Sequence, residues 1–176
     1  AIDPNQPTPR FQLGRLDMNA RRYGEAARHL EFAVEHGITD SEVFTFLGYA
    51  RAILGDVDGA IEIERRGLDA NPNDVAIAKS LAGHLQTAHR SAEAWTVLER
   101  FAPAASDDPA MLCTLAEIEQ DLGRIADAVA TWRRADEHAR RISGFPIPTA
   151  ARLSAAEDLL RREEELLDAL PSIDVS

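Results

Sequence analysis

The sequence predicts an all-α protein made of four successive helix hairpins and one further helix at its C-terminal end. Three observations predict this fold class: a period of 34 residues, a helical spacing of apolar residues within each period, and turn residues between the helices. The period is visible in a Leu-small pair and in a later alanine, which both recur four times. The pairs are Leu13-Gly14, Leu47-Gly48, Leu81-Ala82 and Leu115-Ala116, and the alanines are Ala26, Ala60, Ala94 and Ala128.

We number the residues of each repeat from 1 to 34. The first helix of the repeat is predicted at its beginning. Positions 4 and 7 are mostly apolar and position 8 is small, as Phe44, Leu47 and Gly48 show in the second repeat. In the second helix, position 20 is always alanine. Two helices of a hairpin approach closely only where no bulky side chain separates them, so a larger residue at position 8 or 20 costs about 1–3 kcal/mol. The repeats start at Pro7, Ser41, Val75 and Pro109.

Turn and capping residues predict where these helices begin and end. Gly55-Asp56 and Gly123-Arg124 separate the two helices of repeats two and four. The segment 71–74, Asn-Pro-Asn-Asp, closes repeat two and caps the next helix. The segment 107–109, Asp-Asp-Pro, does the same before repeat four, with proline at the first helical position. The predicted organisation is a leader of residues 1–6 and repeats at 7–40, 41–74, 75–108 and 109–140.

A last helix is predicted at residues 149–170, between a loop at 141–148 with two X-Pro steps and a tail at 171–176. Its leucines Leu153, Leu160 and Leu167 recur every seven residues, with Leu159, Leu166 and Leu170 beside them. The final repeat of such an array exposes an apolar face, so the stripe predicts a capping helix. A heptad stripe also fits pairing with another copy of the chain.

The 34-residue pattern of the Leu-small pair, the alanine and the turn residues resembles the tetratricopeptide repeat (TPR) family over residues 7 to about 140. The resemblance implies a right-handed α-solenoid of four TPR hairpins, followed here by the capping helix. The chain departs from the family at position 4, which is never Trp, and in repeat three, where His89 replaces the turn glycine. It also departs at position 11, which is never Tyr but is Asp17, Arg51, Leu85 and Glu119.

One departure suggests a charged cluster in place of aromatic contacts. The resemblance places position 11 near position 24 of the same repeat and near position 11 of the next repeat. These positions bring together Asp17, Arg51 and Glu64. We therefore expect Arg51 to bridge both carboxylates. The alternative is that all three side chains extend into solvent, where an ion pair contributes only about 0–1 kcal/mol.

Composition excludes several classes of function. The chain has 176 residues and a net charge of −11, with 30 acidic residues against 19 basic ones, of which Lys79 is the only lysine. Such a surface repels phosphate backbones, so nucleic acid is not an expected partner. No apolar run is long enough to span a bilayer, so membrane insertion is not expected. The single cysteine, Cys113, rules out an internal disulfide and predicts a reducing cytoplasmic location.

No residue pattern points to catalysis, to a cofactor or to a metal site. The five histidines have no metal-ligand spacing, no glycine-rich phosphate loop is present, and Cys113 has no candidate base at a motif spacing. We expect Cys113 to be a partly buried structural thiol. The sequence therefore predicts a protein that is not an enzyme and that works through its surface.

The TPR resemblance implies a concave groove lined by positions 2, 5, 6, 9, 12 and 13 of each first helix. Apolar and aromatic residues occupy many of these positions in the first two repeats, although the positions lie outside the core by register. Exposed apolar side chains usually mark a binding surface, here for an extended peptide. Residues 1–8 folding back over the groove are the alternative explanation. The candidate groove residues are Phe11, Arg15, Met18, Phe46, Tyr49, Ile53 and Lys79.

Two TPR subfamilies can be compared at these positions. The clamp that holds a terminal carboxylate in Hsp70- and Hsp90-binding repeats needs Lys, Asn and Arg, but the chain has Phe11, Arg15, Phe46, Ala76 and Ser80 there, so that function is excluded. The segments 46–48 (FLG), 64–67 (ERRG), 84–86 (HLQ) and 92–94 resemble class II type III secretion chaperones, which bind translocator proteins. That family has three repeats, whereas this chain has four and a further helix.

The predicted function is a non-catalytic adaptor or chaperone, of bacterial type, that binds a peptide segment of a partner protein in its groove. Two alternatives remain open from the sequence. One is a type III secretion translocator chaperone. The other is a self-assembling TPR scaffold, with a homodimer formed through the terminal leucine stripe or through the groove.

Overall fold

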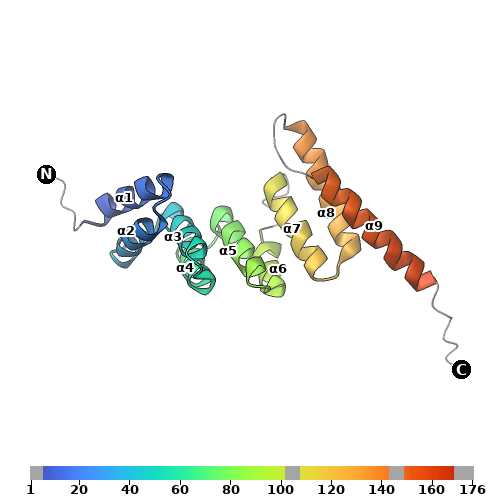
Figure 1. Ribbon diagram of the computed structural model, residues 1–176, viewed down its shortest axis with the longest axis horizontal. Coiled ribbons are helices and arrows are strands. Elements are labelled where there is room, and N and C mark those ends of the chain that lie inside the picture. The colour runs from blue at the N-terminus through green and yellow to red at the C-terminus, as the bar shows by residue number, and fades with distance from the viewer. Residues whose placement is uncertain (1–5, 102–107, 143–148, 169–176) are drawn as a thin grey trace, which may run out of the picture. The chain divides into compact units, whose positions relative to one another are not determined.

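The computed structural model describes residues 6–101, 108–142 and 149–168 (Figure 1). All regular structure in these residues is helical, which confirms the predicted all-α class. Most of the predicted leader, loop and tail lie outside the described residues. The helices are α1 (Pro7–Asn19), α2 (Tyr23–Glu35), α3 (Ser41–Ile53), α4 (Val57–Ala70), α5 (Val75–Thr87), α6 (Ser91–Glu99), α7 (Pro109–Asp121), α8 (Ile125–Arg141) and α9 (Thr149–Asp168).

The 34-residue period extends to the backbone of the turns. The turn between the two helices of each hairpin contains a left-handed residue at the same repeat position: Arg21 (φ 57°), Gly55 (φ 90°), His89 (φ 58°) and Gly123 (φ 72°). The next residue closes the turn in each case, as when the Asp56 amide donates to the Arg51 carbonyl at 2.9 Å. Glycine adopts this conformation without strain, whereas Arg21 and His89 must tolerate it.

The small residues at position 8 lie where two helices approach closely. A Cβ added to Gly14 would lie 2.6 Å from Leu30 Cγ, and one added to Gly48 would lie 2.4 Å from Glu64 Oε1. Both distances are far below van der Waals contact, so neither position admits a side chain without a shift of its neighbour. The alanines at position 20 are fully buried, as the repeat pattern predicts.

The chain forms two compact units, Ala1–Ala102 (unit 1) and Pro103–Ser176 (unit 2). Unit 1 contains α1 to α6, in which α3 packs against both α1 and α5. One cluster of its core consists of buried apolar residues from the first hairpins and the start of α5: Phe11, Ala26, Leu30, Ala33, Val34, Val43, Phe44, Leu47, Ile63 and Ile77.

Unit 2 contains the α7–α8 hairpin and α9, which packs on α8. Ala156 of α9 is fully buried in the core around Trp132, and Leu153 and Leu160 pack against the same cluster. At the start of α9, the Thr149 hydroxyl donates to Asp136 Oδ1 at 2.9 Å. Half of the predicted leucine stripe thus covers the last hairpin, as expected for a capping helix. No described helix is long and apolar enough to cross a membrane.

The predicted charged cluster around Arg51 does not form. Arg51 instead pairs with Glu31 of α2 and donates to the Gly59 carbonyl at 3.1 Å. Asp17 and Glu64, its expected partners, are both buried and are bound by other side chains. The prediction of an Arg51 bridge was therefore wrong, because each carboxylate has a donor closer to it in its own hairpin or in the next one.

Candidate functional site

A surface hollow of about 360 Å³ lies in unit 1 between the first helices of its three hairpins. We call it the hollow, and it is lined by Met18 and Asn19 of α1, Thr45, Phe46 and Tyr49 of α3, and Ser80 of α5. All six residues occupy the repeat positions that the TPR resemblance assigns to the concave groove. Register in the repeat is therefore sufficient to bring residues from three helices to one surface.

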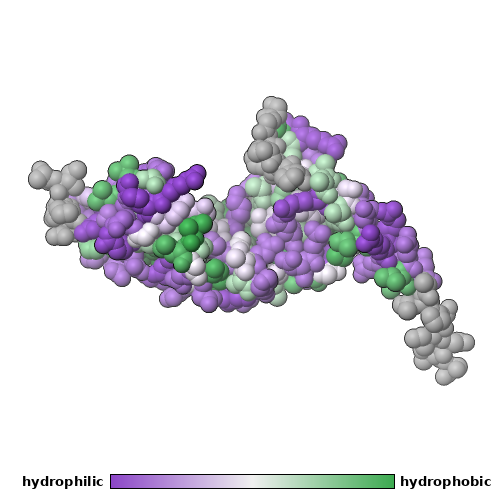
Figure 2. Space-filling model, viewed as in Figure 1, coloured by the Kyte–Doolittle hydropathy of each residue, from purple (hydrophilic) through white to green (hydrophobic). Residues whose placement is uncertain are grey.

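Three of the seven candidate groove residues, Met18, Phe46 and Tyr49, line the hollow. Tyr49 is 47% exposed, and its ring meets the ring of Tyr23 edge-on with centroids 6.0 Å apart. Met18 and Phe46 are half-buried, and their inner atoms pack against the core of unit 1. Figure 2 shows an apolar patch over α3. The hollow thus has apolar walls that are held in place by the core beneath them.

The other four candidate residues lie outside the hollow. Phe11 is only 7% exposed and belongs to the core, so the expectation that it lies on the groove surface is wrong. Arg15 pairs with Glu42 at 3.2 Å, which joins α1 to α3. Ile53 is 51% exposed one turn beyond Tyr49, and Lys79 is half-buried on α5. Ile53 therefore extends the exposed apolar surface, whereas Phe11 does not contribute to it.

A buried carboxylate lies beneath one wall of the hollow. Glu64 of α4 is completely buried, and its Oε1 accepts a hydrogen bond of 2.6 Å from the Ser80 hydroxyl. His84 Nδ1 lies 2.8 Å from Glu64 Oε2. Gly48 leaves the space that the carboxylate fills. These contacts join α3, α4 and α5 and fix Ser80 at the surface of the hollow.

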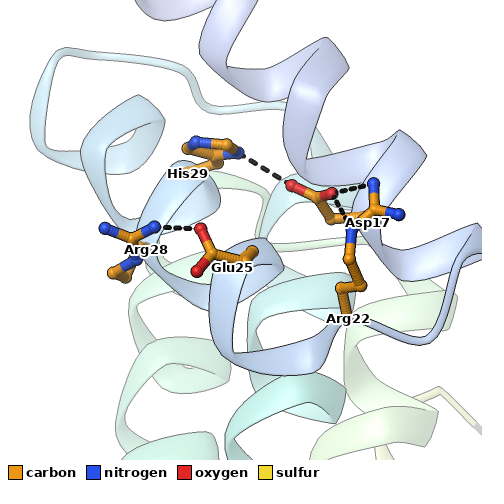
Figure 3. Close-up of polar contacts among 5 residues, drawn as sticks. All are labelled: Asp17, Arg22, Glu25, Arg28 and His29. Carbon is orange, nitrogen blue, oxygen red and sulfur yellow. Dashed lines mark hydrogen bonds and ion pairs between the residues drawn. The ribbon is translucent and has the colours of Figure 1, made fainter.

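A second buried carboxylate holds the end of α1, which carries Met18 and Asn19. Asp17 accepts a hydrogen bond of 2.8 Å from Arg22 Nε, and His29 Nδ1 lies 2.9 Å from its other oxygen. Figure 3 shows the Asp17 carboxylate between His29 of α2 and Arg22, with a separate Arg28–Glu25 pair nearby. Asp17 therefore ties the last turn of α1 to the second helix of its hairpin.

The hollow contains binding groups but no catalytic constellation. No cluster of three or more His, Cys, Asp or Glu side chains that could hold a metal occurs in the described part of the chain. Cys113 lies in unit 2, where burial raises the pKa of its thiol to about 11, so it is a protonated thiol at neutral pH. The polar side-chain groups of the residues that line the hollow are the Asn19 amide and the hydroxyls of Thr45, Tyr49 and Ser80, which can donate and accept hydrogen bonds.

The candidate groove residues were chosen mainly because they are apolar, and this choice missed three residues of the hollow. Asn19, Thr45 and Ser80 occupy positions 13, 5 and 6 of their repeats and line the hollow beside the three apolar residues. The Thr45 hydroxyl bonds to the Ser41 and Glu42 carbonyls of its own helix, and the Ser80 hydroxyl bonds to Glu64. The groove positions themselves are the signal that finds these polar residues.

Paired helices, a turn that recurs every 34 residues and a surface lined by first-helix positions together define a TPR-type helical-repeat fold. No known family model matches the chain, and no curated protein matches it in sequence. The comparison with solved structures therefore provides the independent support for this class.

Three solved structures illustrate the similarity. YrrB, a TPR protein with an unusual peptide-binding site, has a TM-score of 0.75 and 13% identity over 92% of this chain and 79% of that chain. A thermophilic TPR protein in Thermus thermophilus has a TM-score of 0.68 and 18% identity, covering 88% and 82%. MamA from Desulfovibrio magneticus has a TM-score of 0.71 and 19% identity, covering 94% and 97%. The chain has the TPR fold that these proteins share.

Proposed function

We propose that this protein is a non-catalytic adaptor or chaperone that binds an extended segment of a partner protein in the hollow of unit 1. The observation that carries the proposal is the combination of exposed Tyr49 with apolar walls from Met18 and Phe46 on a chain of net charge −11. The volume of about 360 Å³ lies within the usual range of ligand clefts, about 300–1,000 Å³. YrrB, which shares the fold, is described as having a peptide-binding site.

The chemistry of the hollow favours one apolar anchor side chain flanked by peptide backbone. Met18, Phe46 and Tyr49 offer the apolar contact, in which an aromatic or aliphatic anchor buries most of its surface. Asn19 is exposed at the rim, and its amide can both donate to and accept from the backbone of an extended peptide. The Ser80 hydroxyl already donates to Glu64, so it is available to a ligand as an acceptor.

The first test is selection of binding peptides from a random displayed library, followed by affinity measurement with fluorescently labelled peptides. We expect the selected peptides to share an aromatic or large aliphatic residue. The double variant Phe46→Ala, Tyr49→Ala should weaken their binding about tenfold or more, because it removes two walls of the anchor pocket.

The matched control is the double variant Leu16→Ala, Leu54→Ala. Leu16 and Leu54 are 60% and 56% exposed, so this variant also removes two exposed apolar side chains, but neither lines the hollow. We expect it to bind the selected peptides like the wild type. Equal binding by wild type and the Phe46→Ala, Tyr49→Ala variant, at unchanged helicity by circular dichroism, would place the site elsewhere.

The identity of the natural partner distinguishes the narrower alternatives. A type III secretion chaperone would bind a segment of a translocator protein, and purified translocator segments are the probe for it. A cytoplasmic location stays a prediction from the single cysteine, and fractionation of the source cell tests it. Self-assembly, the other alternative, would use the exposed leucines of α9 or the groove itself.

A further inference from the structure

The second half of α9 carries a surface that is exposed in the described part of unit 2. Every described residue from Arg161 to Asp168 is exposed. Leu159, Leu166 and Leu167 are 45%, 70% and 62% exposed, although Leu153 and Leu160 of the same stripe pack on the core. Figure 2 shows apolar side chains gathered towards the C-terminal end of α9. The capping role therefore accounts for only the first half of the leucine stripe.

Four of the exposed residues form one continuous face, along which apolar and charged side chains follow a defined order. Leu159, Arg162, Glu163 and Leu166 are spaced i, i+3, i+4 and i+7, so they lie on one side of the helix. They line a surface hollow of about 430 Å³ together with Leu167 and Ile125 of α8. In sequence order the face presents apolar, positive, negative and apolar groups.

This order is complementary to itself only when the helix direction is reversed. In an antiparallel pair with the two-fold axis between Arg162 and Glu163, Leu159 of each copy faces Leu166 of the other. Arg162 of each copy then faces Glu163 of the other, which gives two ion pairs and two apolar contacts. A parallel pair would instead place Arg162 opposite Arg162 and Glu163 opposite Glu163, which repels.

We propose that a second copy of this chain docks on the Leu159–Leu166 face of α9 as an antiparallel two-fold helix pair. A two-fold interface uses the same patch on both subunits, which is what the self-complementary charge order provides. Residues 157–168 of the two copies face each other, about 18 Å of helix at 1.5 Å per residue. Such a contact is short compared with stable dimer interfaces, so the dimer is weak and depends on concentration. The proposal uses residues of unit 2 only and does not depend on peptide binding in unit 1.

The test begins with the mass of the full chain by sedimentation or light scattering between about 10 μM and about 1 mM, a range suited to weak association. The mass is expected to rise from 19.3 kDa towards twice that value as the concentration increases. The single variants Arg162→Glu and Glu163→Arg should each weaken the dimer about tenfold or more, because each places like charges opposite each other. A wild type that stays monomeric at the highest concentration overturns the proposal.

Mixing the two variants gives the decisive result. Arg162→Glu carries two negative charges at the centre of the face and Glu163→Arg carries two positive ones, so an equimolar mixture should form heterodimers while neither variant dimerises alone. Glu164→Arg is the matched control, since it makes the same charge change on the opposite side of α9 and should leave the dimer intact. Failure of the mixture to associate, or equal loss in the control, overturns the antiparallel arrangement.

The groove variants separate this proposal from the proposed function. Phe46→Ala, Tyr49→Ala should lose peptide binding but keep the wild-type dependence of mass on concentration. The two α9 variants should bind selected peptides as the wild-type monomer does. A dimer abolished by the groove variant would locate self-association in the hollow and overturn the α9 interface.

Discussion

Units 1 and 2 bury carboxylates at equivalent repeat positions but treat them differently. Asp17 in unit 1 and Glu119 in unit 2 are both at position 11, and they are only 6% and 4% exposed. Asp17 is bound by Arg22 and faces His29. Glu119 Oε2 is a buried oxygen with no hydrogen-bond partner. Burial raises the pKa of Glu119, and a hydrogen bond from Thr131 only partly opposes the rise.

One repeat position contributes to this difference. Both units carry an arginine at position 16, Arg22 and Arg124, but position 23 is His29 in unit 1 and Thr131 in unit 2. His29 contacts the second carboxylate oxygen of Asp17, whereas in unit 2 the Thr131 hydroxyl offers one neutral donor to Glu119. Repeats with the same backbone can therefore differ in energy, because partners for a buried charge come from individual side chains.

The largest expected effect concerns Asp17, the buried carboxylate that has hydrogen-bond partners. Asp17→Asn removes the charge that Arg22 and His29 share, and it should lower the free energy of unfolding of unit 1 by about 2 kcal/mol. Native-state hydrogen exchange at pH 7 measures this, since it resolves the amides of α1 and α2 from those of unit 2. An unchanged exchange rate in α1 would mean that the Asp17 cluster is only a surface contact.

The same carboxylate-to-amide change in unit 2 should increase stability instead of lowering it. Glu119→Gln removes a buried charge, one oxygen of which has no hydrogen-bond partner, and it should stabilise unit 2 by about 1 kcal/mol at pH 8. Because the folded-state pKa of Glu119 is raised, wild-type stability is fully present below the ordinary pKa of glutamate and declines as pH rises through the raised value. The advantage of Glu119→Gln should therefore vanish near pH 4.

Trp132 makes this measurement specific to unit 2. It is fully buried in the core of unit 2, and the only other tryptophan, Trp95, lies in unit 1. Urea unfolding followed by fluorescence in a Trp95→Phe background therefore reports unit 2. A variant that gains equally at pH 4 and pH 8 would contradict the assignment of the gain to ionisation.

The smallest expected effect is the cost of replacing a turn glycine, and it should be the same in both units. Gly55 in unit 1 and Gly123 in unit 2 have positive φ in turns closed by the same hydrogen bonds. Alanine at either position should cost about 0.7 kcal/mol, the left-handed strain less the gain from a stiffer unfolded chain. Paired hydrogen-exchange measurements on the two variants check this. Costs that differ widely would show that the turns, too, depend on their unit.

Much of the fold follows from the 34-residue period, because turns and close helix contacts depend on residue types that the sequence displays directly. The starts of α1, α3, α5 and α7 coincide with the predicted repeat starts for this reason. Side-chain choices were less predictable. Phe11 enters the core of the first repeat beside Arg10, which occupies a position that is apolar in the other repeats. Arg51 binds Glu31, since periodicity does not rank the partners within reach of a long side chain.

The contact between Glu64 and the hairpin that follows it limits how this protein can be rearranged. Glu64 belongs to the second repeat and needs Gly48 in that repeat for space, but Ser80 and His84 of the third repeat supply its hydrogen-bond partners. Repeat two transplanted alone into another array would carry a buried carboxylate without its donors. The exchangeable cassette for repeat shuffling is thus residues 41–87, the second hairpin together with α5, and not the 34-residue period.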